Sequence, residues 1–176
     1  MVMKYIRRTS RNIKENFLLE LLRDRKVIND TNISNFLKPT IENEEDPFNL
    51  DHLTAGCRIL MSAILNHKTI YLPIDPDCDG VTSAALFYNY CKEVLEKALN
   101  TEINIIYHIP EGKEHGVSTI MDWFPENGEG NLIFIIDASS NDYDEHQKLV
   151  ERGYEICICD HHEAPHYSEY ATVINN

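Results

Sequence analysis

The chain has 176 residues and a mass of 20.4 kDa, the size of one ordinary domain or of a small domain with an extension. Hydrophobic residues make up 43%, charged residues 26% and aromatic residues 9%, a composition that excludes a disordered, collagen-like or coiled-coil chain. The longest apolar runs are far shorter than the ~20 residues of a transmembrane helix, and the N-terminus lacks the apolar region of a secretory signal. Because the five cysteines are not arranged as a disulfide framework, we expect a reducing, cytoplasmic environment.

The net charge of −13 is unevenly distributed along the chain. Residues 1–26 hold eight of the 16 basic and three of the 29 acidic residues, a net +5 that leaves −18 for the remainder. An acidic surface repels nucleic acid unless cations intervene. A basic arm around Arg7, Arg8 and Arg11 would weaken that repulsion, as would a divalent metal among clustered Asp residues. The alternative for the arm is a solubilising terminus.

The hydrophobic pattern changes near residue 67. Before it, helical spacing predicts helices over residues 12–26, 33–37 and 51–66, with an acidic connector over 40–50. After it, apolar and β-branched runs predict strands over 69–74, 103–109, 131–136, 155–159 and 171–174, with helices over 82–99, 117–124 and 144–152. This alternation predicts an α/β fold with a mainly parallel sheet of about five strands. A helical lead-in, residues 1–66, would precede a domain over residues 67–176.

Acidic and histidine side chains follow three of the predicted strands. They are Asp75, Asp77 and Asp79 after the first strand, Asp137 after the third, and Asp160, His161 and His162 after the fourth. Because the carboxyl ends of parallel strands share one sheet edge, we expect these side chains to converge. Asp and His are ligands of Mn²⁺ or Mg²⁺ rather than of structural Zn²⁺. Each cluster alone could be a turn, a helix cap or solvated surface, but the three together predict a metal site.

Several segments resemble a known family. DPDCDGVTSAA, residues 75–85, resembles motif I of the DHH phosphoesterases, IIDASS resembles motif II, and Asp160-His161-His162 resembles the motif that names the superfamily. Asp75 opens motif I where the pyrophosphatase and nanoRNase branches usually have His, which is similar to the RecJ branch of single-strand-specific exonucleases. YHIPEGKEHGVS, ATVINN and the lead-in with FLKP and DPFNL resemble further RecJ segments. The resemblance covers nearly the whole chain and implies a Rossmann-like DHH domain.

The resemblance also implies a catalytic site that holds two ions of Mn²⁺ or Mg²⁺. Its metal ligands would be one carboxylate for each ion, a bridging carboxylate and a histidine, namely Asp77 and Asp79, Asp137, and His161. The residues around them would be His162, which supports the site or contacts the scissile phosphate, and Asp75 and Asp160, which support the loops. Two cations about 3.5–4 Å apart hold and deprotonate a water and stabilise charge on the phosphoryl group.

Three further residues are candidates for substrate contact. Ser139 and Ser140 would either hydrogen-bond a phosphate or cap the following helix, and we favour the cap. His115 lies where the family has a loop near the active site, which implies a contact with substrate. Cys157 and Cys159 form a CxC pattern, but they alternate with isoleucines and are expected to be small core side chains.

The resemblance implies a metal-dependent phosphodiesterase that degrades single-stranded DNA in the 5′→3′ direction, in DNA repair, recombination or replication. The alternatives are a DHH hydrolase of short oligonucleotides, cyclic dinucleotides or pyrophosphate, and a non-catalytic DHH-type replication or repair scaffold. Asp75 argues against the first, and the intact motifs argue against the second.

RecJ-like proteins have a fourth motif with a metal-binding Asp, and a C-terminal domain, beyond the strand that follows DHH. The chain ends at Asn176, before both. We therefore expect a fragment, a truncated product or one half of a split protein that a second polypeptide completes, with little nuclease activity alone.

Overall fold

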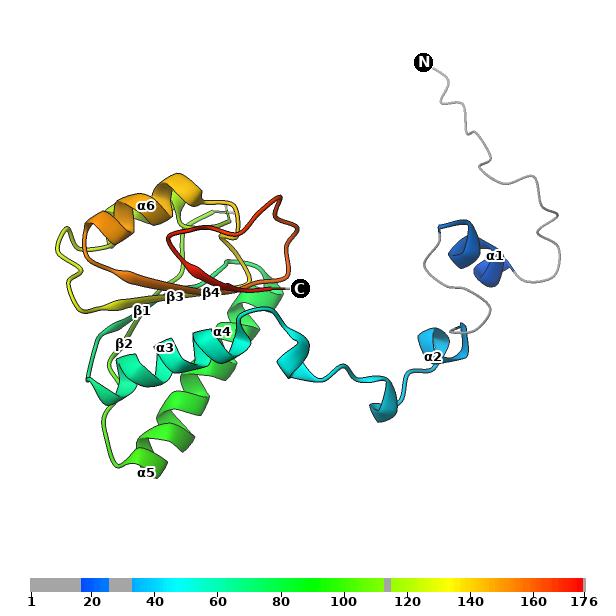
Figure 1. Cartoon of the computed structure of the whole chain (residues 1–176), viewed down its shortest axis with the longest axis horizontal. Helices are drawn as coiled ribbons and strands as arrows, with labels where there is room; N and C mark the ends of the chain where they lie inside the picture. Colours follow the sequence, from blue (N-terminus) through cyan, green and yellow to red (C-terminus); the bar gives the residue numbers. More distant parts are fainter. Residues whose placement is uncertain (1–16, 26–32, 113–114, 176) are drawn as a thin grey trace, which may run out of the picture. The chain divides into compact units, whose positions relative to one another are not determined.

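The computed structural model describes residues 17–25, 33–112 and 115–175 (Figure 1). The predicted basic arm with Arg7, Arg8 and Arg11 lies outside the described residues. The chain divides into two compact units, Met1–Asp46 and Pro47–Asn176. The described elements of the first unit are α1 (Phe17–Asp24), α2 (Ile33–Leu37) and the 3₁₀ helix η1 (Ile41–Asn43). The domain boundary between residues 66 and 67 stays a prediction.

The second unit is a parallel β-sheet with helices on both faces. Its strands are β1 (Ile70–Pro73), β2 (Ile105–His108), β3 (Leu132–Ile136), β4 (Glu155–Cys159) and β5 (Thr172–Ile174). Its helices are η2 (Pro47–Asn49), α3 (Leu53–Leu65), α4 (Cys78–Tyr90), η3 (Cys91–Leu95), α5 (Glu96–Leu99), η4 (Ser118–Trp123) and α6 (Tyr143–Glu151). The strand order is β2-β1-β3-β4-β5 and every pairing is parallel, which confirms the predicted α/β class and five-stranded sheet. None of the described helices is long and apolar enough to cross a membrane.

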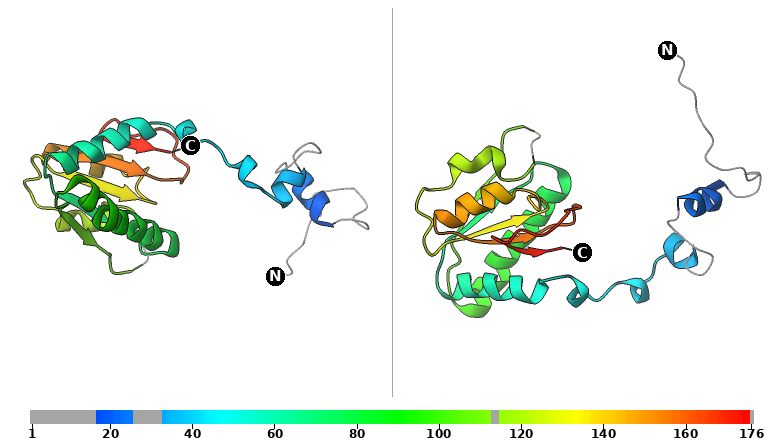
Figure 2. Two further views of the ribbon diagram at one scale, coloured as in Figure 1. Left: turned by 90° about the horizontal axis from the view of Figure 1, so that it is seen from below. Right: turned by 45° about the horizontal axis from the view of Figure 1, so that its top comes forward.

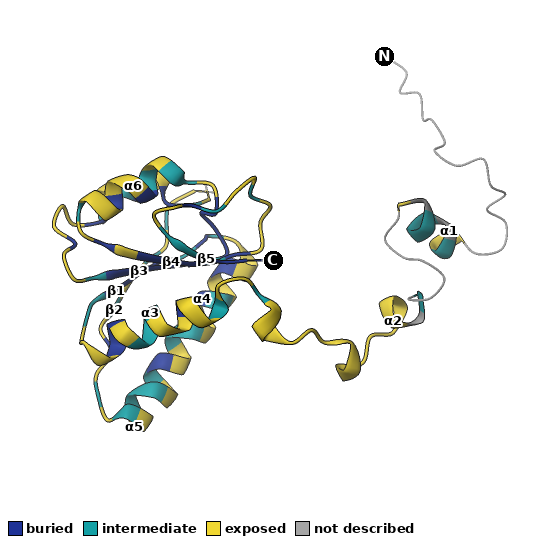
Figure 3. Cartoon of the chain, viewed as in Figure 1, coloured by how far each residue is buried: buried dark blue, intermediate teal, exposed yellow. Residues whose placement is uncertain are grey.

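The sheet separates two apolar cores. Helices α3 and α4 lie on one face and α6 lies on the other, as Figure 1 and the right view of Figure 2 show. Because successive strand residues point to opposite faces, adjacent residues of β3 serve different cores. Leu132 belongs to the cluster that contains Ile64 of α3, whereas Ile133 belongs to the cluster that contains Leu149 of α6. Burial on both faces (Figure 3) explains why β3 is a continuous apolar run.

Helix α4 begins at Cys78, four residues before its predicted start at Thr82. Asp77 occupies the N-cap position, where its Oδ1 accepts a hydrogen bond from the backbone N–H of Gly80 at 3.1 Å. This bond satisfies one of the amide groups that a first helical turn leaves unpaired. The predicted start at Thr82 is therefore one helical turn too late, and Asp79 projects from the first turn of α4.

The central strand should dominate the stability of the second unit. The Leu132 side chain is fully buried, whereas Leu86 on α4 is 73% exposed. Leu132→Ala should lower the free energy of unfolding by about 2–5 kcal/mol, because it opens a cavity between sheet and helices. Leu86→Ala, the same chemical change at the surface, should change it by no more than about 0.5 kcal/mol. Urea unfolding followed by circular dichroism measures both, and equal losses would contradict the assigned core.

Candidate metal centre

The register of the sheet aligns the ends of three strands. Ile74 forms a parallel bridge with Ile136, and Ile136 pairs with Cys159. The residue that follows each of them is an aspartate, in the order Asp75, Asp137 and Asp160. Backbone pairing thus sets three carboxylates, far apart in sequence, in one row along the carboxyl edge of the sheet.

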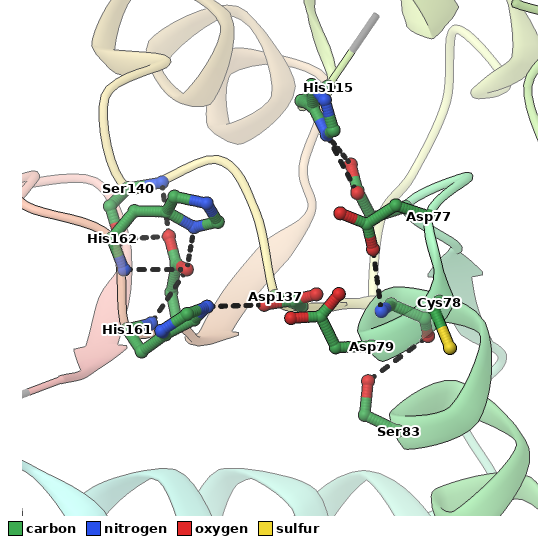
Figure 4. Close-up of polar contacts among 12 residues, drawn as sticks. Asp77, Cys78, Asp79, Ser83, His115, Asp137, Ser140, His161 and His162 are labelled. Carbon is green, nitrogen blue, oxygen red and sulfur yellow. Dashed lines mark hydrogen bonds and ion pairs between the residues drawn. The ribbon is translucent and has the colours of Figure 1, made fainter. Parts of the chain in front are cut away.

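Three overlapping groups of residues could each hold a metal ion. Their side chains come from this row, from the N-terminus of α4 and from two loops. Within each group, one nitrogen or oxygen atom from every residue lies within 4.8 Å of the others. The groups are Asp75, Asp77 and His115; Asp77, Asp79 and Asp137; and Asp137, His161 and His162. Asp77 and Asp137 each belong to two groups, so the donors are contiguous (Figure 4). The structure therefore brings the expected ligands together, while their roles as ligands stay predictions.

Asp137 lies at the centre of this arrangement and is 6% exposed. Its Oδ1 is 3.0 Å from Nε2 of His161, but its Oδ2 is buried and has no hydrogen-bond partner among the described residues. Burial raises the pKa of Asp137, and the negative charges of Asp79 and Asp77 raise it further. A buried carboxylate oxygen without a donor is costly, and a divalent cation among these carboxylates would satisfy it.

The turn after β3 holds Asp137 in a strained conformation. Asp137 has φ 67° and Ser139 has φ 77°, and the left-handed region costs a non-glycine residue about 1–3 kcal/mol. Two hydroxyls brace the turn: Ser139 Oγ donates to Asp142 Oδ2 at 2.6 Å, and Ser140 Oγ donates to Asp160 Oδ2 at 2.5 Å. Our expectation that these serines cap the next helix is wrong, because the N-cap residue of α6 is Asp142 and both hydroxyls bond to carboxylates.

The Asp160 carboxylate accepts hydrogen bonds from both His161 and His162. Its Oδ1 accepts from the backbone N–H of His161 at 2.7 Å and from Nδ1 of His162 at 2.7 Å. Burial alone would raise the pKa of Asp160, but hydrogen bonds from Ser140 and His162 outweigh it and lower that pKa. The same bond to Asp160 raises the pKa of His162. With Nδ1 engaged, His162 keeps Nε2 for another partner.

Asp75 and Gly80 fix the geometry of the motif I segment. The Asp75 side chain is 1% exposed, and its two oxygens lie 2.8 and 2.9 Å from Nδ1 of His115. A Cβ on Gly80 would lie 2.5 Å from Cβ of Asp75 and 2.6 Å from its carbonyl oxygen, so only glycine lets α4 start this close to β1. The hydrogen bond from Gly80 N also lowers the pKa of Asp77, with a further contribution from Asp79.

Asp142 is a residue of this region that the sequence pattern does not single out. An aspartate directly before a helix is ordinarily an N-cap, yet the Asp142 side chain makes no capping bond. Its carboxylate instead contacts Ser139 and the backbone of Val117. A single sequence carries no signal that separates this role from that of an ordinary cap.

Two cavities adjoin the donor groups. The larger, about 690 Å³, is lined by His161, His162, Glu163, Ala164, Pro165, His166, Tyr167 and Asn175. The smaller, about 180 Å³, is lined by His115, Gly116, Ala138, Ser139, Ser140, Asn141, Asp142, Asp160 and His162. His162 lines both cavities.

The DHH family, N-terminal domain, matches residues 68–176, and the chain therefore belongs to the DHH family. The chain is 37% identical over 127 residues to the SPbeta prophage-derived protein YorK of Bacillus subtilis, which is named as a single-strand DNA-specific exonuclease, and this covers 72% of the chain. It is 28% identical over 114 residues, 64% of the chain, to the single-stranded-DNA-specific exonuclease RecJ of Thermus thermophilus. The matched regions are 20% and 16% of these relatives, so the chain spans about a fifth of their length.

Two crystal structures of manganese-bound RecJ share the fold. RecJ from Thermus thermophilus in complex with Mn²⁺ matches with a TM-score of 0.55 at 21% identity, over 76% of this chain and 18% of that one. A second structure, of exonuclease RecJ bound to manganese, matches with a TM-score of 0.60 at 21% identity, over 75% of this chain and 33% of that one. These structural matches confirm the fold, and the sequence matches to YorK and RecJ confirm the RecJ resemblance for the portion that the chain represents.

The buried charge at Asp137 should destabilise the metal-free protein. Because its folded-state pKa is raised, the ionised form costs stability above that pKa, and the cost vanishes as the pH falls below the ordinary value of about 3.9. Asp137→Asn should therefore raise the Tm in a chelator by a few degrees at pH 7 and by less at acidic pH. Asp144→Asn on the exposed face of α6 is the control. A lower Tm for Asp137→Asn at pH 7 in differential scanning calorimetry would contradict the assignment.

Proposed function

We propose that this chain carries the metal centre of a single-strand DNA exonuclease that hydrolyses phosphodiester bonds with two divalent ions, Mn²⁺ or Mg²⁺. The observation that carries the proposal is the buried, unpartnered Oδ2 of Asp137, at the centre of three contiguous donor groups among the described residues. Membership of the DHH family and the activities for which YorK and RecJ are named support the same reaction class.

The donor set fits hard divalent cations. Carboxylates and imidazoles suit Mn²⁺, and carboxylate oxygens suit Mg²⁺. When bound, two such ions would supply a deprotonated water and stabilise charge on the transferring phosphoryl group. Asp77, the N-cap residue of α4, and Asp79, in its first turn, would hold one ion each, and Asp137 would be a ligand shared by both ions. His161, whose Nε2 already lies 3.0 Å from Asp137 Oδ1, would complete the set.

The remaining residues would orient the substrate and the ligands. Asp160 holds Nδ1 of His162 and raises its pKa, so His162 would present a protonated Nε2 to a phosphate oxygen. Asp75 fixes His115 through Nδ1, which places that ring beside the smaller cavity for a second contact with the strand. The hydroxyls of Ser139 and Ser140 are engaged by Asp142 and Asp160, so we assign them to bracing the Asp137 turn and not to substrate binding.

The proposed substrate is single-stranded DNA, degraded 5′→3′ as the RecJ resemblance implies. The protein carries a formal charge of −13, so its encounter with a polyanion would depend on the ions at the sheet edge and on the basic residues 1–26. The large open cavity beside His161 and His162 would admit the strand.

A nuclease assay on end-labelled single-stranded DNA tests the proposal. The 176-residue chain should shorten the strand slowly in Mn²⁺ and not in a chelator, and a 5′ label should be released as short products. Asp137→Ala should reduce the rate by about 100-fold, because it removes a ligand shared by both ions. Asp144→Ala, which removes an exposed carboxylate from α6, should leave the rate unchanged.

The other outcomes separate the alternatives. Mn²⁺ that raises the Tm of the wild type but not of Asp137→Ala, without cleavage of any strand, would favour a scaffold role. Faster hydrolysis of dinucleotides, cyclic dinucleotides or pyrophosphate than of long strands would favour the short-substrate hydrolase. Cleavage that Asp137→Ala leaves intact would overturn the proposed site.

A further inference from the structure

Two loop segments carry side chains of the metal centre from opposite sides. The segment from His115 to Val117 places His115 against Asp75. The turn at residues 137–140 carries Asp137 and braces Asp160 through Ser140. Neither segment belongs to a strand of the sheet, so the sheet register alone does not fix their separation.

The carboxylate of Asp142 contacts both segments through one oxygen. Its Oδ2 accepts from Ser139 Oγ at 2.6 Å and from the backbone N–H of Val117 at 2.8 Å. Gly116 has φ 83°, and a Cβ there would come within 2.3 Å of the same oxygen. The segment is therefore shaped around this carboxylate, and the fit requires glycine.

The Asp142 side chain does not cap α6, although the residue directly precedes that helix. It is the N-cap residue of α6, but its side chain makes no bond to the first helical turn. Behind Ser139, the fully buried His146 of α6 lies with Nε2 at 3.4 Å from Ser139 Oγ. Because an ionised carboxylate can only accept, Ser139 donates its proton to Asp142, and the serine oxygen is left to accept from His146 in the tautomer that carries the proton on Nε2.

We propose that Asp142 is a positioning residue that fastens the two halves of the metal centre together, an inference that rests on the function proposed above. Through Ser139 it holds the left-handed turn of Asp137, the proposed bridging ligand. Through Gly116 and Val117 it holds His115 against Asp75. Loss of its carboxylate would release both segments while leaving every metal ligand in the chain.

Calorimetric titration of the chain with Mn²⁺ tests the inference. Asp142→Ala should bind Mn²⁺ about tenfold more weakly than the wild type, the lower end of the effect of residues that orient metal ligands. Asp142→Asn should stay close to the wild type, because its amide oxygen can accept from both Ser139 and Val117. Asp144→Ala removes the same charge two residues further on, in the first turn of α6, and should also stay close to the wild type.

Hydrogen exchange of the metal-free chain gives a second readout that needs neither metal nor activity. In Asp142→Ala, the Val117 amide and the amides of residues 137–140 should exchange faster, and in Asp142→Asn they should not. Unchanged exchange at Val117 would overturn the contact itself. Faster exchange with unchanged Mn²⁺ affinity would overturn the positioning role. A wild type that binds no Mn²⁺ would overturn the proposed metal function and the positioning role with it, whereas the exchange data would still decide whether Asp142 joins the segments.

Discussion

Repulsion among carboxylates at one edge of the sheet is the constraint around which the second unit is built. Parallel pairing brings Asp75, Asp137 and Asp160 into a row, and the N-terminus of α4 adds Asp77 at the N-cap and Asp79 in the first turn. Burial of Asp137 beside two of these charges raises its pKa and leaves one of its oxygens without a donor among the described residues. The fold does not relieve this repulsion by moving the residues apart. It holds them together, which is unfavourable alone and favourable around a cation.

The buried carboxylates of this region differ in whether protein groups donate hydrogen bonds to their oxygens. Asp160 accepts from Ser140, His161 and His162, and its pKa is lowered despite burial. Asp142 is bonded to Ser139 and Val117. Asp137, by contrast, keeps an oxygen that no described residue pairs. Because buried polar atoms are generally satisfied, the unpaired oxygen supports the proposed role of Asp137 as a metal ligand.

The sequence predicts that the acidic strand ends come together at one sheet edge. It does not predict the hydrogen bonds that hold the loops around them. Alternating strands and helices imply a parallel sheet, and a parallel sheet brings strand ends to one edge, so the sequence alone places Asp75, Asp137 and Asp160 together. It does not predict the start of α4 at Cys78, because Asp77 in an Asp-rich segment resembles a loop residue. The role of Asp142 is hidden for a different reason: its partner Val117 is 25 residues away, and such a contact leaves no local pattern.

The carboxylates at the strand ends and the neighbouring histidines differ in how far their side chains are exposed. Along the sheet edge the carboxylates lie deep, with the side chains of Asp137 and Asp160 7% and 1% exposed, and the histidines lie above them, with His161 and His162 66% and 53% exposed. Asp77 and Asp79, by contrast, are exposed like the histidines, so a polyanionic strand that approaches this edge meets both imidazoles and carboxylates. The hydrogen bond to Asp160 raises the pKa of His162, which favours the protonated form of that side chain. In the proposed function, divalent ions among these carboxylates and a protonated His162 would together offset the negative charge that otherwise repels a nucleic-acid strand.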